Sequence, residues 1–233
     1  MKAMILAAGL GKRMRPLTDK LPKPLLPVAG KPLIFHHLLK LKRAGIDEVI
    51  INTSYLGHLI KAALGDGSQF GLRILYSEES QPLETGGAIY KALPLLGDEP
   101  FLLVNGDVWV DCDFSILLDH ALSESSLGHL LLVPNPDHCV SGNFSASQQT
   151  EQGGVLTLTP VQDGAESYTF SGVSVLRPQL VSEYPQCREY FPLREALFWA
   201  METRQLNGEV YKGQWVDVGT PERLADLERV LAT

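Results

Sequence analysis

The feature that most constrains the fold is an alternation of short apolar runs and helical patterns through the first 105 residues. The apolar runs have the length of buried strands and lie at residues 3–8, 48–52, 72–77 and 101–105. Segments with apolar residues three or four positions apart separate them, at residues 32–44, 56–64 and 86–95. Repeated strand–helix–strand units give parallel neighbouring strands with helices on both faces. We therefore expect the α/β class with a mostly parallel central sheet.

The second half of the chain is less regular. Strand patterns are found at residues 127–133, 168–176 and 211–218, and a helical pattern at residues 193–203. Residues 137–164 are rich in Ser, Gln, Gly and Asn and are expected to form loops with short strands. Thr220 can cap a last helix that starts at Pro221. The simplest organisation is one domain over residues 1–233 with a small insertion near residues 135–170.

Charge and cysteine content exclude several functions. The chain has 20 Lys and Arg against 27 Asp and Glu, a formal net charge of −7, so we expect no general nucleic-acid surface, which would be positive. Its three cysteines form no Cys-x-x-Cys pair, which argues against a disulfide framework or a zinc site. No apolar run approaches the ~20 residues that span a bilayer. These features favour a cytoplasmic protein that acts away from membranes.

A glycine-rich basic loop follows the first buried strand. Gly9 and Gly11 let the backbone pass close to a ligand and leave amide groups that can face phosphate oxygens. Lys12 and Arg13 add positive charge in the same loop, and Lys23 follows between two prolines. In a parallel α/β sheet, ligands bind beyond the carboxyl ends of the strands. We therefore expect a polyphosphate site here rather than a solvated turn.

Two common phosphate motifs do not fit this loop. A dinucleotide fingerprint has a third glycine and an acidic residue at the end of the second strand, but this chain has Met14 and Asn52 at those positions. A P-loop has Ser or Thr after Gly-Lys, where this chain has Arg13. A Gly-x-Ser-x-Gly nucleophile elbow is absent, and the six histidines show no metal-ligand spacing. None of these classes is favoured.

Three further segments contain residues suited to a substrate site. Asp107 follows the strand at residues 101–105, where a carboxylate can hold Mg²⁺ beside phosphates, although a simple Asn-Gly-Asp turn is the alternative. Asp217 lies among apolar residues, where an unpaired carboxylate is costly, so we expect a cation or a helix-capping contact for it. The small residues at 81–88 either let a flat base approach or begin a helix.

Together these segments resemble the signature of the sugar-1-phosphate nucleotidylyltransferases. The resemblance rests on Leu-Ala-Ala-Gly-Leu-Gly-Lys-Arg-Met-Arg-Pro-Leu-Thr, Pro-Lys-Pro-Leu-Leu-Pro-Val, Pro-Leu-Glu-Thr-Gly-Gly-Ala, Val-Asn-Gly-Asp and Trp-Val-Asp-Val-Gly-Thr-Pro. These motifs are spread over essentially the whole chain. The family implies a three-layer, Rossmann-like nucleotidyltransferase fold with a small β insertion on the sugar side.

The resemblance also implies roles for particular residues. It implies that Arg13 and Lys23 are catalytic and that Asp107 and Asp217 bind Mg²⁺. The implied nucleotide-binding residues are Ala8, Gly9, Gly11, Lys12, Arg13, Lys23 and Gly86. The implied sugar-phosphate-binding residues are Asn105, Asn143 and Gly172. Asn143 stands where close relatives have an acidic contact, so it keeps an acceptor oxygen without the charge.

The implied reaction joins a nucleoside triphosphate and a sugar 1-phosphate, with Mg²⁺ as cofactor. The short length and the run Phe-Leu-Leu-Val-Asn-Gly-Asp-Val-Trp are most similar to members that use UTP and N-acetylmuramate 1-phosphate in cell-wall recycling. A mannose-1-phosphate guanylyltransferase is the alternative within the family, and a non-catalytic nucleotide-binding module is the alternative outside it. The Glu-Lys-Pro segment of many thymidylyl- and glucose-type relatives is absent between residues 135 and 165, which argues against those sugars.

Overall fold

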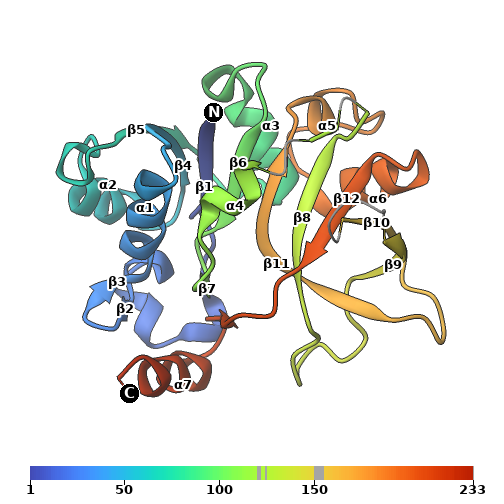
Figure 1. Ribbon diagram of the computed structural model, residues 1–233. Helices are drawn as coiled ribbons and strands as arrows, with labels where there is room; N and C mark the ends of the chain where they lie inside the picture. The colour runs from blue at the N-terminus through green and yellow to red at the C-terminus, as the bar shows by residue number, and fades with distance from the viewer. Residues whose placement is uncertain (120–121, 124, 150–154, 233) are drawn as a thin grey trace.

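The computed structural model describes residues 1–119, 122–123, 125–149 and 155–232. Within these residues the central sheet has nine strands in the order β5-β4-β1-β6-β11-β8-β12-β10-β9. Helices lie on both sides of this sheet (Figure 1). The α/β class and the three-layer arrangement are therefore confirmed.

Four neighbouring strands at one side of the sheet are parallel, as the alternation in the sequence predicts. They are β1 (Lys2–Leu6), β4 (Glu48–Thr53), β5 (Arg73–Glu78) and β6 (Phe101–Asn105). The helices between them in the chain are α1 (Leu33–Arg43), α2 (Gly57–Leu64) and α3 (Glu84–Leu96). Leu6 pairs with both Asn52 and Asn105 in the register of the sheet. The carboxyl ends of the strands therefore lie level along one edge.

The remaining five strands of the sheet pair mainly in antiparallel fashion. They are β8 (Gly128–Val133), β9 (Phe144–Gln149), β10 (Leu156–Thr159), β11 (Ser167–Leu176) and β12 (Leu206–Val210). β11 is antiparallel to β6, β8 and β9, whereas β12 is parallel to β8. β9 and β10 follow each other in the chain and pair in antiparallel fashion, a connection that needs no crossover helix. The expected parallel pairing thus holds for the first half of the chain.

Of the strand expected at residues 211–218, the structure has only the short strand β13 (Trp215–Asp217), which pairs with β7 (Val108–Val110) outside the main sheet. β12, which ends just before this range, was not expected. β12 could not be predicted from the sequence, because it contains Asn and Gly, which are poor strand formers. Gly208 is nevertheless needed there, since a Cβ at this position would lie 2.8 Å from the carbonyl oxygen of Leu130.

The hydrophobic core is divided between the two faces of the sheet. Successive side chains of a strand point to opposite faces, so Met4 joins one cluster while Ala3 and Ile5 join the other. The helices against the first cluster are α3, α5 (Gln179–Ser182) and α6 (Leu193–Glu202). The helices against the second cluster are α1, α2 and α4 (Phe114–Asp119).

The C-terminal helix α7 (Pro221–Leu231) lies beside segments from the beginning of the chain (Figure 1). The Oγ1 of Thr220 accepts a hydrogen bond from the N–H of Arg223 at 3.4 Å, which confirms the predicted cap. Buried leucines of α7 pack with Met14 and Trp109 in a third cluster. The short elements between β1 and α1 are β2 (Pro27–Val28), β3 (Lys31–Pro32) and the 3-10 turns Lys12–Met14, Leu17–Asp19 and Lys23–Leu25. A further 3-10 turn, Ser68–Phe70, precedes β5.

The segment expected to be a sugar-side insertion contributes to the same sheet. β10 pairs with both β9 and β12, and β9 also pairs with β11. Residues 150–154, within this segment, lie outside the described residues. The division into one domain with an insertion near residues 135–170 stays a prediction. Among the residues that the structure describes, no helix is both long and apolar enough to cross a membrane.

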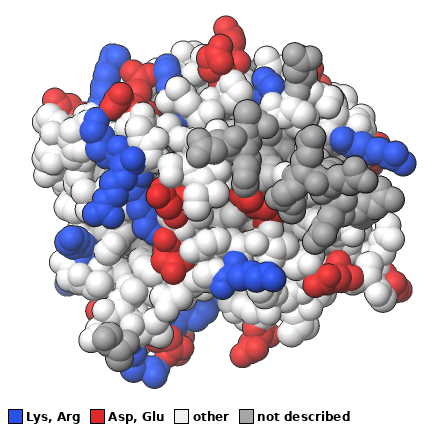
Figure 2. All heavy atoms as spheres, viewed as in Figure 1, with Lys and Arg blue, Asp and Glu red and all other residues white. Residues whose placement is uncertain are grey.

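Charged side chains of both signs occur on the face of the molecule shown in Figure 2. Lys and Arg gather on the side where α1 and α2 lie in Figure 1. α1 itself ends with Lys40, Lys42 and Arg43, and positive charge is favourable at a helix C-terminus. Lys42 also forms an ion pair of 2.6 Å with Asp47. These basic residues therefore stabilise the C-terminal end of α1.

Candidate active site

A cavity of about 430 Å³ opens at the carboxyl edge of the parallel strands. One wall is the loop that follows β1, another is the segment that leads into α3, and residues at the ends of β4, β5 and β6 complete the lining. The sequence-predicted residues in this lining are Ala8, Gly9, Gly11, Lys12, Arg13, Lys23, Asn105 and Asp107. The cavity thus lies where a parallel α/β sheet places its ligand.

The loop after β1 presents bare main chain to the cavity. A Cβ built at Gly9 would meet no atom within 4 Å. Gly11 has a φ of +59°, and a Cβ there would lie 2.8 Å from the Cγ2 of Thr18. Thr18, which the sequence did not single out, is buried and donates a hydrogen bond to the carbonyl oxygen of Gly11 at 2.8 Å. Lys12 and Arg13 follow on an exposed 3-10 turn, so the loop offers amide groups and two cations.

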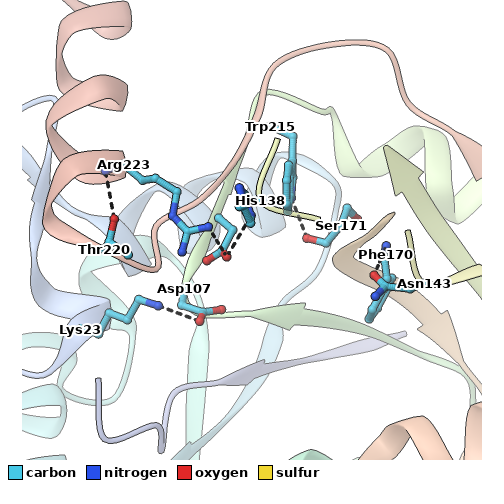
Figure 3. Close-up of polar contacts among 10 residues, drawn as sticks. Lys23, Asp107, His138, Asn143, Phe170, Ser171, Trp215, Thr220 and Arg223 are labelled. Atoms are coloured by element: carbon cyan, nitrogen blue, oxygen red, sulfur yellow. Dashed lines mark hydrogen bonds and ion pairs between the residues drawn. The ribbon is translucent and has the colours of Figure 1, made fainter. Parts of the chain in front are cut away.

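Lys23 is a buried cation in contact with Asp107. Its side chain is only 9% exposed, and its Nζ lies 2.8 Å from the Oδ2 of Asp107 (Figure 3). An ammonium group that leaves water needs an anionic partner, and Asp107 supplies one while 42% of its own side chain stays exposed. Pro22 and Pro24 flank Lys23 and stiffen the turn that carries it.

A small two-stranded sheet brings Asp217 beside Asp107. β13 pairs with β7 so that Asp217 lies opposite Val108. The N–H of Val218 also donates to the carbonyl oxygen of Asp107 at 2.9 Å. Asp107, in the turn just before β7, and Asp217, at the end of β13, are thus brought together from distant parts of the chain.

Asp217 has two basic neighbours that the sequence reasoning missed. The Nη1 of Arg223 and the Nε2 of His138 lie 3.0 and 3.7 Å from its Oδ2. Arg223 is in the first turn of α7, where the helix dipole disfavours positive charge. An arginine at this unfavourable position could have indicated, from the sequence, that its guanidinium pairs with an acidic group outside the helix. Gly219 leaves room for it, since a Cβ there would overlap the guanidinium.

The residues predicted on the sugar side occupy two places, and only Asn105 lines the cavity. Gly172 lies against Asn105, since it has a φ of +84° and a Cβ there would lie 2.8 Å from the Nδ2 of Asn105. Asn143 lies elsewhere, and its Oδ1 accepts a hydrogen bond from the N–H of Phe170 at 2.9 Å (Figure 3). β11 changes register between Phe170 and Val173. Asn143 therefore supports this irregular stretch of strand, and its oxygen already has a partner.

Gly86 is not among the residues that line the cavity. Its N–H donates to the carbonyl oxygen of Phe191 at 2.9 Å, and a Cβ there would lie 2.5 Å from the Phe191 ring. The space beside Gly86 is thus filled by Phe191, whose segment is distant in sequence. Glu84 and Thr85 line the cavity instead. Tyr190 donates to the Oε1 of Glu84 at 3.2 Å, so the same distant segment supports both positions.

Comparison with known proteins gives matches over nearly the whole of this chain. The chain matches the Nucleotidyl transferase family over residues 2–233. It is 47% identical, over 98% of its length, to the N-acetylmuramate alpha-1-phosphate uridylyltransferase of Neisseria meningitidis serogroup B and covers 97% of that protein. It is 36% identical, over 99% of its length, to the mannose-1-phosphate guanylyltransferase of Mycobacterium tuberculosis and covers 65% of it. A solved structure described as a glucose-1-phosphate thymidylyltransferase of Bacillus anthracis has a TM-score of 0.85, with 22% identity over 99% of this chain and 94% of that one.

The chain therefore belongs to the nucleotidyl transferase family, as a sugar-1-phosphate nucleotidyltransferase. The sequence motifs had indicated this family, and the match over residues 2–233 confirms it. The similarity to the solved structure, at 22% identity, shows that the fold is shared.

Proposed function

We propose that the protein transfers UMP from UTP to N-acetylmuramate α-1-phosphate and releases pyrophosphate. The observation that carries this proposal is the match to the Neisseria meningitidis relative, which is 47% identical and nearly equal in length. The mannose-1-phosphate guanylyltransferase of Mycobacterium tuberculosis is less similar, at 36% identity. The higher identity thus favours the uridylyltransferase reaction.

The proposed reaction depends on charge neutralisation more than on proton transfer. A phosphate oxygen of the sugar 1-phosphate forms a bond to the α-phosphorus of UTP while the bond to pyrophosphate breaks. The attacking oxygen is already an anion near pH 7, so no general base is required. The main difficulty is that the sugar 1-phosphate and the triphosphate of UTP repel each other and must be held in line. Positive side chains and backbone amides at fixed positions can offset this repulsion.

Each group of cavity residues has a part in this proposal. Arg13 and Lys23 are proposed to neutralise the triphosphate and the departing pyrophosphate. The bare main chain at Gly9 and Gly11 supports a role for the loop amides as further donors. Asn105 is proposed to contact the sugar phosphate. Ala8 and Lys12 line the same wall and are proposed to complete the nucleotide contacts. Gly172 is proposed to act on the sugar side through Asn105, against which it lies. A sugar-phosphate contact of Asn143, whose oxygen accepts from Phe170 away from the cavity lining, stays a prediction.

Asp107 and Asp217 are proposed to hold Mg²⁺. The pairing of β13 with β7 and the hydrogen bond from Val218 to Asp107 bring the two residues together, which supports this, because Mg²⁺ is commonly bound by one or two carboxylates together with phosphates and water. Bound there, the ion would offset negative charge on the reacting phosphates. Each carboxylate lies beside a basic side chain, Lys23 for Asp107 and Arg223 for Asp217, which reduces the repulsion between the two anions.

A matrix of substrates tests the proposal. Pyrophosphate release is measured with UTP, GTP and dTTP against the 1-phosphates of N-acetylmuramate, N-acetylglucosamine, glucose and mannose, all with Mg²⁺. We expect the highest kcat/KM for UTP with N-acetylmuramate 1-phosphate. Preference for GTP and mannose 1-phosphate would instead support the guanylyltransferase alternative. Release of no pyrophosphate from any pair would contradict both and favour a non-catalytic nucleotide-binding module.

A further inference from the structure

A chain of buried hydrogen bonds connects two walls of the cavity. It starts at the main chain of Ala7, passes through the side chains of Asn52 and Glu79, and ends at the main chain of Leu83. We infer that Asn52 and Glu79 are positioning residues that fix the phosphate-binding loop and the entry to α3 at one separation around the nucleotide. The inference rests on the proposed function, because it takes a nucleotide as the occupant of the cavity.

Asn52 attaches this relay to the loop after β1. Asn52 lies near the end of β4 and is only 3% exposed. Its Oδ1 accepts a hydrogen bond from the N–H of Ala7 at 2.7 Å. The backbone pairing of β1 with β4 ends one residue earlier, at Leu6 and Asn52. The Asn52 side chain therefore binds the first residue beyond the paired part of β1. The start of the phosphate-binding loop is thereby tied to β4.

Glu79 attaches the relay to the opposite wall. Its own N–H donates to the carbonyl oxygen of Thr53 at 2.8 Å, which fixes its backbone to β4. Its Oε2 accepts a hydrogen bond from the N–H of Leu83, the residue before α3, at 3.1 Å. Glu84, the next residue, has a φ of +62°, a strained conformation for a side chain of this kind. The relay thus supports a strained turn that lines the cavity.

The order of donors and acceptors in the relay permits only one arrangement. Asn52 accepts with its oxygen from Ala7 and donates with its Nδ2 to the Oε1 of Glu79 at 2.7 Å. Glu79 accepts at both oxygens, which suits a carboxylate and suits neither an amide nor a protonated acid. Asn52 and Glu79 are 3% and 7% exposed, so a mismatched group has little access to water. Burial raises the pKa of the Glu79 carboxyl, and its hydrogen bonds from Asn52 and Leu83 oppose this shift.

Exchanging the two side-chain types tests the relay. In Glu79→Gln, one amide oxygen must serve two donors, and in Asn52→Asp, two carboxylates face each other. The double variant Asn52→Asp/Glu79→Gln restores a complete relay, because the aspartate accepts from Ala7 and from the glutamine amide, whose oxygen accepts from Leu83. Each single variant should raise KM for UTP about ten-fold, the effect of one mismatched buried polar group, with a much smaller change in kcat. The double variant should return to within about three-fold of the parent KM.

Glu195→Gln is the matched control, because it makes the same chemical change at a carboxylate that pairs with Tyr184 and Arg188 outside the cavity. It should leave KM for UTP unchanged. Melting temperatures are measured for every variant, and kinetics are run well below them. Single variants that melt earlier but keep the parent KM would overturn the inference, as would a double variant no better than the worse single one.

The parent protein separates this inference from the proposed function. Its melting temperature is measured with and without UTP and Mg²⁺, beside its turnover. A parent with neither a UTP-dependent shift nor turnover would refute the proposed function. A parent that binds and turns over UTP, together with variants that behave like it, would refute the relay alone.

Discussion

Lys23→Met separates the proposed chemical role of Lys23 from its structural role. The Lys23 side chain is only 9% exposed, and methionine has a similar length, so the site stays filled. Asp107 remains 42% exposed and can be solvated without its partner, so we expect the free energy of unfolding to change by about 1–2 kcal/mol. Loss of the ammonium group should lower kcat/KM about 100- to 1000-fold, or about 2.7–4 kcal/mol of transition-state stabilisation.

Two assays on the same preparation check this prediction. Pyrophosphate release with UTP, Mg²⁺ and N-acetylmuramate 1-phosphate gives kcat/KM, and urea denaturation gives the free energy of unfolding. Lys42→Met is the control, because Lys42 lies on α1 and pairs with Asp47 away from the cavity. A folded Lys23→Met variant with the parent kcat/KM would refute the assigned role of Lys23.

Two further predictions concern stability and are measured by urea denaturation without nucleotide. Gly86→Ala should reduce the free energy of unfolding by about 1–3 kcal/mol, because its Cβ would press on the Phe191 ring; an unchanged value would contradict this packing. Burial, and then the charge of Lys40, lowers the pKa of His37 from 6.5 to about 3. Between pH 6.5 and pH 3 only the unfolded chain binds this proton, so the free energy of unfolding should decrease as the pH is lowered. The loss should reach about 2 kcal/mol at pH 5. His37→Leu should remove that loss between pH 7.5 and 5, and an unaltered loss would count against it.

The sequence was sufficient to predict the parallel half of the sheet and the position of its ligand edge. Short apolar runs ended by polar or small residues identify β1, β4 and β6, which are buried on both faces, and the half-buried edge strand β5. The antiparallel half was less predictable. β12 contains Gly208, which local propensity disfavours and which is needed only because Leu130 approaches it from another strand.

The predicted site residues also depend partly on contacts between distant segments, which the sequence does not reveal. The loop with Gly9 and Gly11 could be identified locally, because its glycines and cations are consecutive. The position of Asp217 beside Asp107 depends on the pairing of β13 with β7, which no local pattern contains. Gly86 was expected beside a base, but its neighbour is Phe191, more than 100 residues further along the chain. Long-range packing decides such positions.

Asn52 illustrates how a residue can be noticed for the wrong reason. In the sequence it served only to exclude a dinucleotide fingerprint, which has an acidic residue at that strand end. In the structure its amide joins the loop at Ala7 to the buried carboxylate of Glu79. Neither partner is predictable from spacing, because the contact depends on the strands being level at their carboxyl ends.

The most direct test of the account is whether Asp107 and Asp217 act on one bound ion. Asp107→Asn, Asp217→Asn and the double variant are compared by kcat at saturating Mg²⁺ and UTP, after their folding has been checked. Each single substitution should lower kcat about 100- to 1000-fold. The double variant should be within about three-fold of the worse single one, because loss of either ligand already disables the shared ion. Losses that multiply in the double variant would contradict the account.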